Sequence, residues 1–406
     1  MAPKGTFENN FEDYSEGTAI TVLNGTQDAI SSKLQRKLQK YTDAKLHYLT
    51  TELASDIFYD NTVYTGSAGL ALYYFMSSLN KKDTCTENLR SALLYININN
   101  LKGHRISFLC GDAGPLALAT VISYKLGRDN TDLPDYKTLV QRLVSLMSLL
   151  NDSPDELLYG KSGYLYALLF VYKYIDERSI FPLHYIEKVV FAILKSGKEY
   201  SQQVKSSSPL LWQWHDKVYL GGAHGVAGIL YILLQAQAHI SANDMQTLIK
   251  PTLDWLITQK FPSGNFPSSL KSASGDRFVQ WCHGAPGFVP LLILAYQIFG
   301  DDKYMKTALQ CGNVVWERGL STKGYSICHG VSGNAYTFIQ LYQATKEPIH
   351  LYRACCFTEW CCLERSGTEL MPPERPASLF EGLVGRLYLA GDLQNLPLAH
   401  FPAYTV

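Results

Sequence analysis

The amino-acid sequence predicts an all-α protein, a single-domain (α/α)7 toroid in which seven inner helices are surrounded by seven outer helices. Three observations lead to this fold class. A G-x-x-G motif recurs seven times, apolar helical segments follow the motifs, and amphipathic segments lie between the repeats. The alternation of apolar and polar residues that indicates a strand is not convincing anywhere between the repeats.

The spacing of the motifs indicates a repeat architecture. The intervals between first glycines run from 45 residues (Gly66 to Gly111) to 65 residues (Gly160 to Gly225). Periods of this size are typical of arrays or closed rings of supersecondary units. The motifs begin at Gly66, Gly111, Gly160, Gly225, Gly284, Gly330 and Gly382. Glycine permits a positive φ or a close backbone contact, so we expect these residues where loops enter helices at a crowded barrel mouth.

The segments between glycines divide into two kinds. Those that directly follow a motif, such as 164–175, are apolar around most of the helix circumference, as expected of an inner layer. The segments 87–102, 136–150, 184–199, 243–259, 303–319 and 350–364 are amphipathic and fit an outer layer. Each unit then reads as outer helix, loop, motif and inner helix. Residues 1–25 are polar and are expected to form an N-terminal arm across the barrel domain of residues 26–406.

Charge and cysteine usage exclude several classes of protein. The 36 Lys and Arg residues balance 36 Asp and Glu residues, which argues against a nucleic-acid partner and against a polybasic membrane-surface protein. The longest apolar stretches reach about half of the ~20 residues that a membrane span needs. Because the N-terminus has no apolar signal-like region, we expect a cytoplasmic protein, with peripheral membrane association still open. Its nine cysteines are then read as thiols or metal ligands.

Histidine and cysteine recur at equivalent places in the motifs. His224, His283 and His329 each precede the first glycine of a motif, and Cys282 and Cys328 precede two of these histidines. Equivalent positions lie on equivalent loops, so two thiolates and an imidazole converge from adjacent units. This is a ligand set that zinc prefers, and three protein ligands with an open fourth position are typical of a catalytic site. The repeat alone leaves open whether His283 or His329 is the third ligand.

Other residues in or near the motifs support weaker predictions. His224 has no cysteine before it, and it is expected either to move a proton near the metal or to be a structural histidine. Cys110 directly precedes the first glycine of its motif, a position that histidine occupies in other motifs, which makes it a weaker ligand candidate. The cysteine pairs at 355–356 and 361–362 lie on an amphipathic segment and are expected to be buried free thiols.

At these motifs the sequence resembles the eukaryotic lanthionine synthetase C-like (LanC-like) proteins. The resemblance covers nearly the whole chain. It rests on the segments Trp281–Gly287, Gly324–Gly330, Ala223–Gly225, Phe108–Pro115, Leu158–Gly160, Ser378–Gly382 and Phe401–Ala403. It implies a double α-barrel with one zinc ion per chain, held by Cys282, Cys328 and His329.

The resemblance also implies an activity. Members of this kind bind glutathione, whose thiol takes the open zinc position, and add it to dehydroalanine or dehydrobutyrine in damaged proteins to form a thioether. Simple glutathione S-transferase activity is also attributed to the family. A zinc-bound thiol is deprotonated and becomes the attacking thiolate. His224 is then the general acid that protonates the enolate formed after addition.

Further site residues follow from the same resemblance. The implied glutathione contacts are Lys4, Lys323, Met371, Pro372, Pro373 and Glu374. Met371 stands where the family has a basic residue, and Glu374 replaces a shorter acid. Glu156 corresponds to an aspartate of the bacterial cyclases, which makes it a second catalytic candidate beside His224.

Two other functions compete with this one. A non-catalytic zinc- and glutathione-binding signalling or scaffold protein would use the same ligands, and the proline-rich stretch 371–376 would suit an SH3-type partner. An α/α-barrel glycosidase would need an acid pair, for which Asp112 and Glu381 are available. That function gives the in-register Cys-His pairs no role, so the sequence does not favour it.

Overall fold

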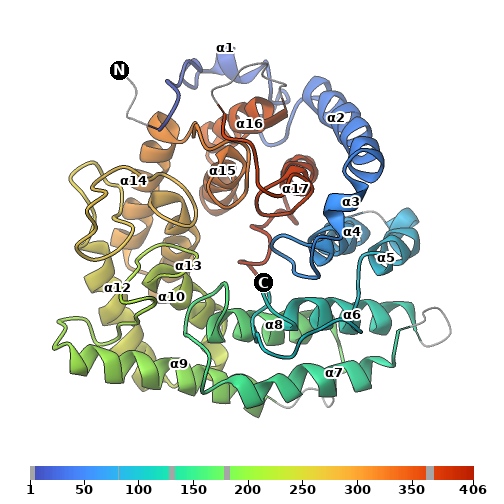
Figure 1. Ribbon diagram of the computed structural model, residues 1–406. Coiled ribbons are helices and arrows are strands. Elements are labelled where there is room, and N and C mark those ends of the chain that lie inside the picture. The colour runs from blue at the N-terminus through green and yellow to red at the C-terminus, as the bar shows by residue number, and fades with distance from the viewer. Residues whose placement is uncertain (1–4, 81, 128–132, 178–182, 363–369) are drawn as a thin grey trace. The chain divides into compact units, whose positions relative to one another are not determined.

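The structure is a computed structural model that describes residues 5–80, 82–127, 133–177, 183–362 and 370–406. Helices dominate these residues, and the only β-structure found among them consists of isolated bridges (Figure 1). The helices that follow the glycine motifs are α4 (Ser67–Asn80), α6 (Ala113–Leu126), α8 (Lys161–Tyr174), α10 (Val226–Gln235), α13 (Val289–Phe299), α15 (Val331–Thr345) and α17 (Leu383–Gln394). The main helices between them are α2 (Ser32–Thr51), α5 (Cys85–Leu93), α7 (Tyr136–Ser145), α9 (His184–Gln203), α12 (Lys250–Ile257), α14 (Asp302–Arg318) and α16 (Pro348–Cys362).

The chain forms two compact units. The first unit comprises residues 1–57 and 260–402, and the second comprises residues 58–259 and 403–406. The first unit therefore contains α2 and the helices from α13 to α17, and the second contains those from α4 to α12. Each unit has inner and outer helices of its own.

Burial separates the two kinds of helix as the sequence predicts. In the second unit, α8 is buried from Lys161 through Val171, whereas α9 buries residues at helical spacing, including Ile186, Val189, Val190 and Ile193. In the first unit, α15 is buried from Val331 through Tyr342. A helix that is apolar all round belongs in a core, and an amphipathic helix covers it.

The glycines serve close backbone approach more than positive φ. Gly330 has an extended backbone with φ −111°, and a Cβ on Gly333 would overlap the carbonyl oxygen of Ile327. Of the glycines that open a motif, Gly284 is the one with a positive φ, at 113°. The loop before each inner helix thus folds back against the first turn of that helix, which leaves no room for a side chain.

The pairing of helices differs from the unit expected from the sequence. Each inner helix generally packs most closely on the outer helix that follows it, as in α4 with α5 and α15 with α16. The last inner helix, α17, packs instead on α2 near the start of the chain (Figure 1). The expected order along the chain, with an outer helix before each motif and inner helix, is present, but the packing partners could not be predicted, because hydrophobic periodicity identifies a helix face but not its partner.

The N-terminal segment lies along the outer helices of the first unit. The backbone N–H of Phe7 donates to the carbonyl of Leu320 at 2.7 Å, and the side chain of Asn9 donates to the carbonyl of Trp316 at 2.7 Å. The hydroxyl of Tyr352 donates to the carbonyl of Glu12 at 2.9 Å. These bonds fix residues 5–14 before the short helix α1 (Glu16–Ala19).

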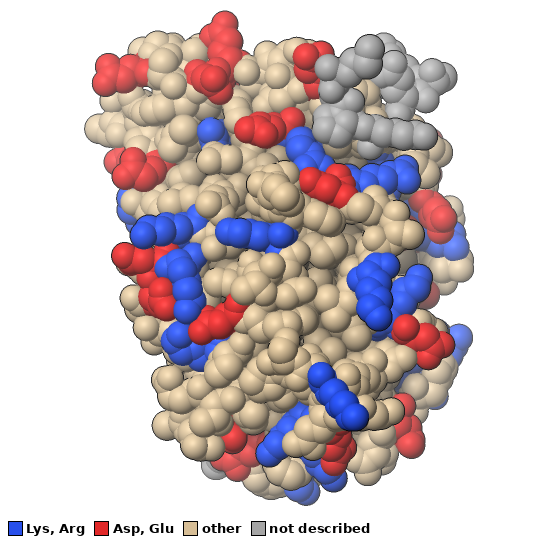
Figure 2. Space-filling model, turned by 90° about the vertical axis from the view of Figure 1, so that its left-hand side faces the viewer, with Lys and Arg blue, Asp and Glu red and all other residues tan. Residues whose placement is uncertain are grey.

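Surface charge and helix hydropathy agree with the composition. On the face drawn in Figure 2, Lys and Arg side chains are interspersed with Asp and Glu side chains. In the described part of the chain, no helix combines the length and the apolar character that a bilayer crossing requires.

The close backbone packing at the glycine motifs leads to a prediction about stability. Gly333→Ala should lower the free energy of unfolding by about 1–3 kcal/mol, because the new methyl group meets backbone that cannot rotate away. Gly391→Ala is the matched control, because its Cβ meets nothing within 4 Å in the middle of α17; it should raise stability by about 0.5–1 kcal/mol. Urea unfolding of both variants measures the difference, and equal effects would contradict the packing argument.

Candidate functional site

Cys282 and Cys328 meet in the first unit. They lie on the loops that precede the short 3-10 helix η7 (Ala285–Gly287) and α15, and the backbone N–H of Cys282 donates to the carbonyl of Cys328 at 3.2 Å. Both residues are nearly buried, with exposed fractions of 7% and 5%. Their thiols are close enough to hydrogen-bond with one another. The predicted convergence of two sulfurs from adjacent repeats is therefore present.

The two thiols differ in acidity. The hydrogen bond from Cys328 lowers the pKa of Cys282; burial opposes this, and the charge of Lys323 and the amide of Gln280 support it. Gln280 Nε2 lies 3.2 Å from Cys282 Sγ. The same thiol contact, together with burial, raises the pKa of Cys328 well above its ordinary value. Cys282 is therefore the sulfur that this environment favours as a thiolate.

His329 lies next to the two thiols. The His329 imidazole hydrogen-bonds the Cys328 thiol, which partly offsets the rise of that pKa. His329 also lines a neighbouring cavity. Within the described residues, no three His, Cys, Asp or Glu side chains are spaced as a finished metal site. Two adjacent thiols and an imidazole are nevertheless the donor chemistry that suits zinc.

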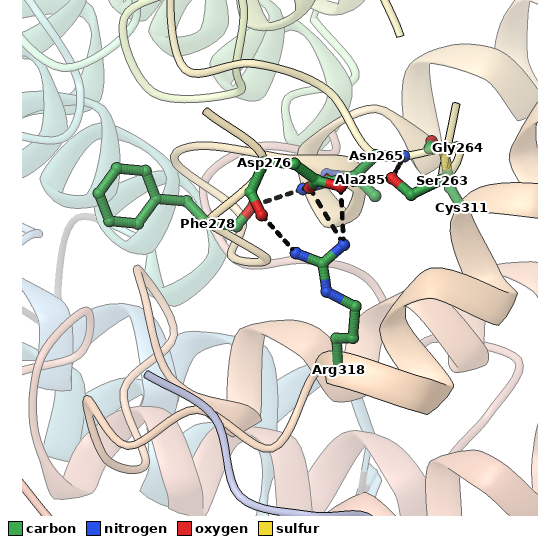
Figure 3. A network of polar contacts seen from close by, with 8 residues as sticks. All are labelled: Ser263, Gly264, Asn265, Asp276, Phe278, Ala285, Cys311 and Arg318. Atoms are coloured by element: carbon green, nitrogen blue, oxygen red, sulfur yellow. Dashed lines mark hydrogen bonds and ion pairs between the residues drawn. The ribbon is translucent and has the colours of Figure 1, made fainter. Parts of the chain in front are cut away.

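A polar network orients the loop that carries Cys282 (Figure 3). Asn265 is fully buried; its Nδ2 donates to Asp276 at 2.8 Å and to the Phe278 carbonyl at 2.9 Å, and its Oδ1 accepts from the Ala285 N–H at 2.8 Å. Arg318 on α14 donates to the Asp276 carboxylate at 3.1 Å and to the Asp276 carbonyl at 2.8 Å. The loop is thus tied at both ends of the Cys282-His283-Gly284 segment.

The network also sets the charge of Asp276. Burial acts to raise the pKa of this carboxyl, but hydrogen bonds from Ser263 and Asn265 and the charge of Arg318 outweigh burial and lower it. Asn265, Asp276 and Arg318 were not predicted from the sequence. Single polar residues in a loop and at a helix end have no periodicity that distinguishes them from surface residues.

The cavity next to His329 has a volume of ≈ 640 Å³ and lies within the first unit. Its wall contains five of the six residues predicted to contact glutathione, namely Lys323, Met371, Pro372, Pro373 and Glu374. The sixth, Lys4, lies outside the described residues. The prolines of the 371–376 stretch are therefore part of a cavity wall. The backbone N–H of Met371 donates to the Thr322 carbonyl at 3.2 Å, which joins this loop to the segment before Lys323.

The cavity wall carries both signs of charge. Lys45 and Arg386, which sequence reasoning missed, lie on the wall with Lys323, and the acids there are Glu374 and Glu381. The pKa of Glu381 is raised by burial and, further, by the negative charge of Glu374. Such a wall suits a ligand that carries both carboxylate and ammonium groups.

His224 and Glu156 form a pair in the second unit. His224 Nδ1 lies 2.6 Å from Glu156 Oε2, and the Glu156 side chain is 1% exposed. The two carboxylate oxygens also accept backbone N–H groups from Leu158 at 2.9 Å and Tyr159 at 2.6 Å. Glu156 is thereby fixed, and it holds one nitrogen of an imidazole whose side chain is 21% exposed. This is the arrangement in which a carboxylate orients a histidine for proton transfer.

The other cysteine predictions can also be compared with the structure. Cys355, Cys356 and Cys361 are buried and free, and burial raises the pKa of each. Cys362 is free but only half-buried. These thiols are poor nucleophiles, as expected of core residues. Cys110 is buried in the second unit beside Tyr159.

With this geometry in place, comparison with known proteins identifies the family. A model of the lanthionine synthetase C-like protein family matches residues 57–406. The chain belongs to this family, as its motifs predict. It is 38% identical over 412 residues to a Danio rerio protein named glutathione S-transferase LANCL1, with 100% of both chains covered.

Two further comparisons extend this result. The Arabidopsis thaliana LanC-like protein GCL1 is 33% identical over 367 residues, covering 86% of this chain and 82% of that protein. A solved structure of nisin cyclase superposes with a TM-score of 0.66 at 17% sequence identity, covering 90% of this chain and 95% of the other. This likeness shows the fold, and it confirms the predicted all-α toroid.

The loop network predicts a pH-dependent loss of stability. Asp276→Asn should lower the free energy of unfolding at pH 7 by about 1–3 kcal/mol, because it leaves the half-buried Arg318 without its anion. The folded-state pKa of Asp276 is lowered, so its contribution is complete above the unfolded pKa of ~3.9 and is lost as pH falls through the folded pKa. The difference between variant and wild type should therefore shrink in acid.

Thermal unfolding between pH 3 and pH 7 measures this effect. Glu359→Gln is the control, since it removes a more exposed ion pair with Lys37, worth at most about 1 kcal/mol. An Asp276→Asn difference that stays constant with pH would contradict the network's role.

Proposed function

We propose that this chain is a zinc-dependent glutathione transferase that adds the glutathione thiol to dehydroalanine or dehydrobutyrine residues of proteins, or to other electrophiles. The observation that carries this proposal is the contact between the buried thiols of Cys282 and Cys328, with His329 beside them on a cavity wall. The name of the zebrafish relative supports the same chemistry.

The donor set supports one zinc ion per chain. Cys282, Cys328 and His329 would hold it, and the lowered pKa of Cys282 favours the deprotonated sulfur that a metal needs. When bound, zinc supplies a positive centre at which a thiol loses its proton at neutral pH. A set of three protein ligands leaves a position for an outside thiol.

The charges of the cavity support glutathione as the thiol donor. Glutathione carries two carboxylates and one ammonium group. On the cavity wall, Lys45, Lys323 and Arg386 carry charges complementary to the carboxylates, and Glu374 and Glu381 carry charges complementary to the ammonium group. A ligand held at several charged points is also oriented, so that its thiol reaches the wall that His329 lines.

His224 is the proposed general acid. The glutathione sulfur forms a bond to the β-carbon of the dehydroamino acid while the double bond gives its electron pair to the α-carbon and carbonyl. The resulting enolate needs one proton on the α-carbon. With Nδ1 held by Glu156, the Nε2 of His224 is the atom left to deliver that proton.

Removal of either sulfur should abolish zinc and activity together. Cys282→Ala and Cys328→Ala should each hold less than a tenth of the wild-type zinc, because two remaining ligands bind zinc poorly. Each should also form the glutathione adduct of a dehydroalanine peptide at least about 100-fold more slowly. Elemental analysis and mass spectrometry provide the two measurements. Cys85→Ala, at a half-exposed cysteine, should match wild type in both.

Full activity in a metal-free Cys282→Ala protein would overturn the zinc proposal. Normal zinc and glutathione binding with no adduct from wild type would instead identify a binding protein without this activity.

Loss of the proposed acid should leave zinc in place. His224→Ala should keep the wild-type zinc content and lower kcat by about 10²–10⁴-fold, the usual contribution of general acid catalysis. Glu156→Gln should have a smaller effect, because the histidine remains but its orientation and charge are less well supported. Single-turnover assays with saturating glutathione give the comparison. Wild-type turnover in His224→Ala would exclude this residue as the proton donor.

A further inference from the structure

The second unit holds three aromatic rings around His224 that the proposed proton transfer does not use. Tyr159 stacks on the imidazole with ring centroids 6.1 Å apart and planes 13° apart. Trp214 lies at 6.5 Å and 23°, and Tyr219 at 5.8 Å and 51°. The Tyr159 and Trp214 rings are themselves 6.1 Å apart. We call Tyr159, Trp214 and Tyr219 the aromatic wall; all three are half-buried and so retain surface for a ligand.

One residue of the wall, Trp214, begins a tight turn with an uncommon backbone conformation. Trp214 and Lys217 exchange two backbone hydrogen bonds, of 2.9 Å and 3.1 Å. The residues between them, His215 and Asp216, have φ values of 46° and 59°. Such turns favour asparagine, aspartate and glycine, and a positive φ at two consecutive non-glycine residues is uncommon. Strained backbone of this kind persists where surrounding contacts impose it, and it is concentrated at ligand-binding sites.

Local contacts hold the turn in this conformation. Gln213 Nε2 donates to Asp216 Oδ1 at 3.1 Å, and the His215 ring lies 4.0 Å from the Trp214 ring. The indole is therefore fixed next to His224. Preorganised aromatic rings bind another ring at low entropic cost, with centroids 4.5–7 Å apart.

We propose that the aromatic wall binds an aromatic side chain that lies next to the dehydroamino acid in a polypeptide substrate. This inference rests on the proposed function and names the sequence context which that function would prefer. The wall lies about 6 Å from the imidazole that supplies the proton. One residue of extended chain spans about 3.3–3.6 Å, so the bound side chain is one or two residues from the acceptor.

Charge favours a neutral ring over a cation at this wall. The guanidinium of Arg105 already lies 5.3 Å from the Tyr159 ring. A second cation beside Tyr159 would be repelled by Arg105, whereas a neutral aromatic side chain would not.

The test compares two dehydroalanine pentapeptides as substrates of the full-length zinc-containing protein, with glutathione as the thiol donor. One has phenylalanine on both sides of dehydroalanine, and the other has glycine. Wild type should show kcat/KM about tenfold higher for the phenylalanine peptide. Trp214→Ala should reduce this ratio to about two or less, and Trp214→Phe should keep most of it because a ring remains. Trp255→Ala, on α12 of the same unit, is the control and should keep the wild-type ratio.

The outcomes separate this inference from the proposed function. Equal kcat/KM values for the two peptides in wild type, or an unchanged ratio in Trp214→Ala, would overturn the aromatic wall and leave glutathione transfer intact. If neither peptide forms an adduct, the proposed function fails. In that case the aromatic wall is tested by calorimetry, with unreactive peptides that have alanine in place of dehydroalanine. Tighter binding of the phenylalanine peptide that is lost in Trp214→Ala would support the aromatic wall. Equal binding of the two peptides would reject it.

Discussion

The contact between the thiols of Cys282 and Cys328 is the interaction on which the candidate site depends. Two thiols buried side by side do not ionise independently, and here the Cys328 proton and the Lys323 charge favour the thiolate of Cys282. A shared cation would remove the electrostatic cost of ionising both. The surroundings are consistent with this role, since His329 adds a nitrogen donor to the pair and lines the adjoining cavity.

Backbone packing makes that contact possible. The loop before α15 folds back so closely on the helix start that Gly333 has no room for a side chain, and the two cysteine loops are joined by a backbone hydrogen bond. The Asn265–Asp276–Arg318 network then fixes the Cys282 loop from α14. The sulfurs are thus held by main-chain geometry and buried polar bonds, which is the preorganisation that a reactive centre requires.

Much of the fold and part of the site could be predicted from the sequence, for a physical reason. Helical periodicity and repeat spacing are local properties, so inner and outer helices and the in-register cysteines could be recognised along the chain. The pairing of α17 with α2 could not, because it joins segments that are distant in sequence. Lys45 and Arg386 were missed for the same reason, as they belong to those two helices and only the tertiary structure brings them to one cavity. The turn at His215 and Asp216 was missed because it lacks the Asn-Gly or Asp-Gly pair that normally marks such a turn.

The binding of zinc by Cys282, Cys328 and His329 is tested most directly by X-ray absorption at the zinc edge of the purified protein, before and after addition of glutathione. We expect one zinc per chain with two sulfur ligands and at least one nitrogen ligand, and a third sulfur ligand once glutathione is added. Absence of zinc, or a zinc shell that contains no sulfur or does not change with glutathione, would contradict this expectation.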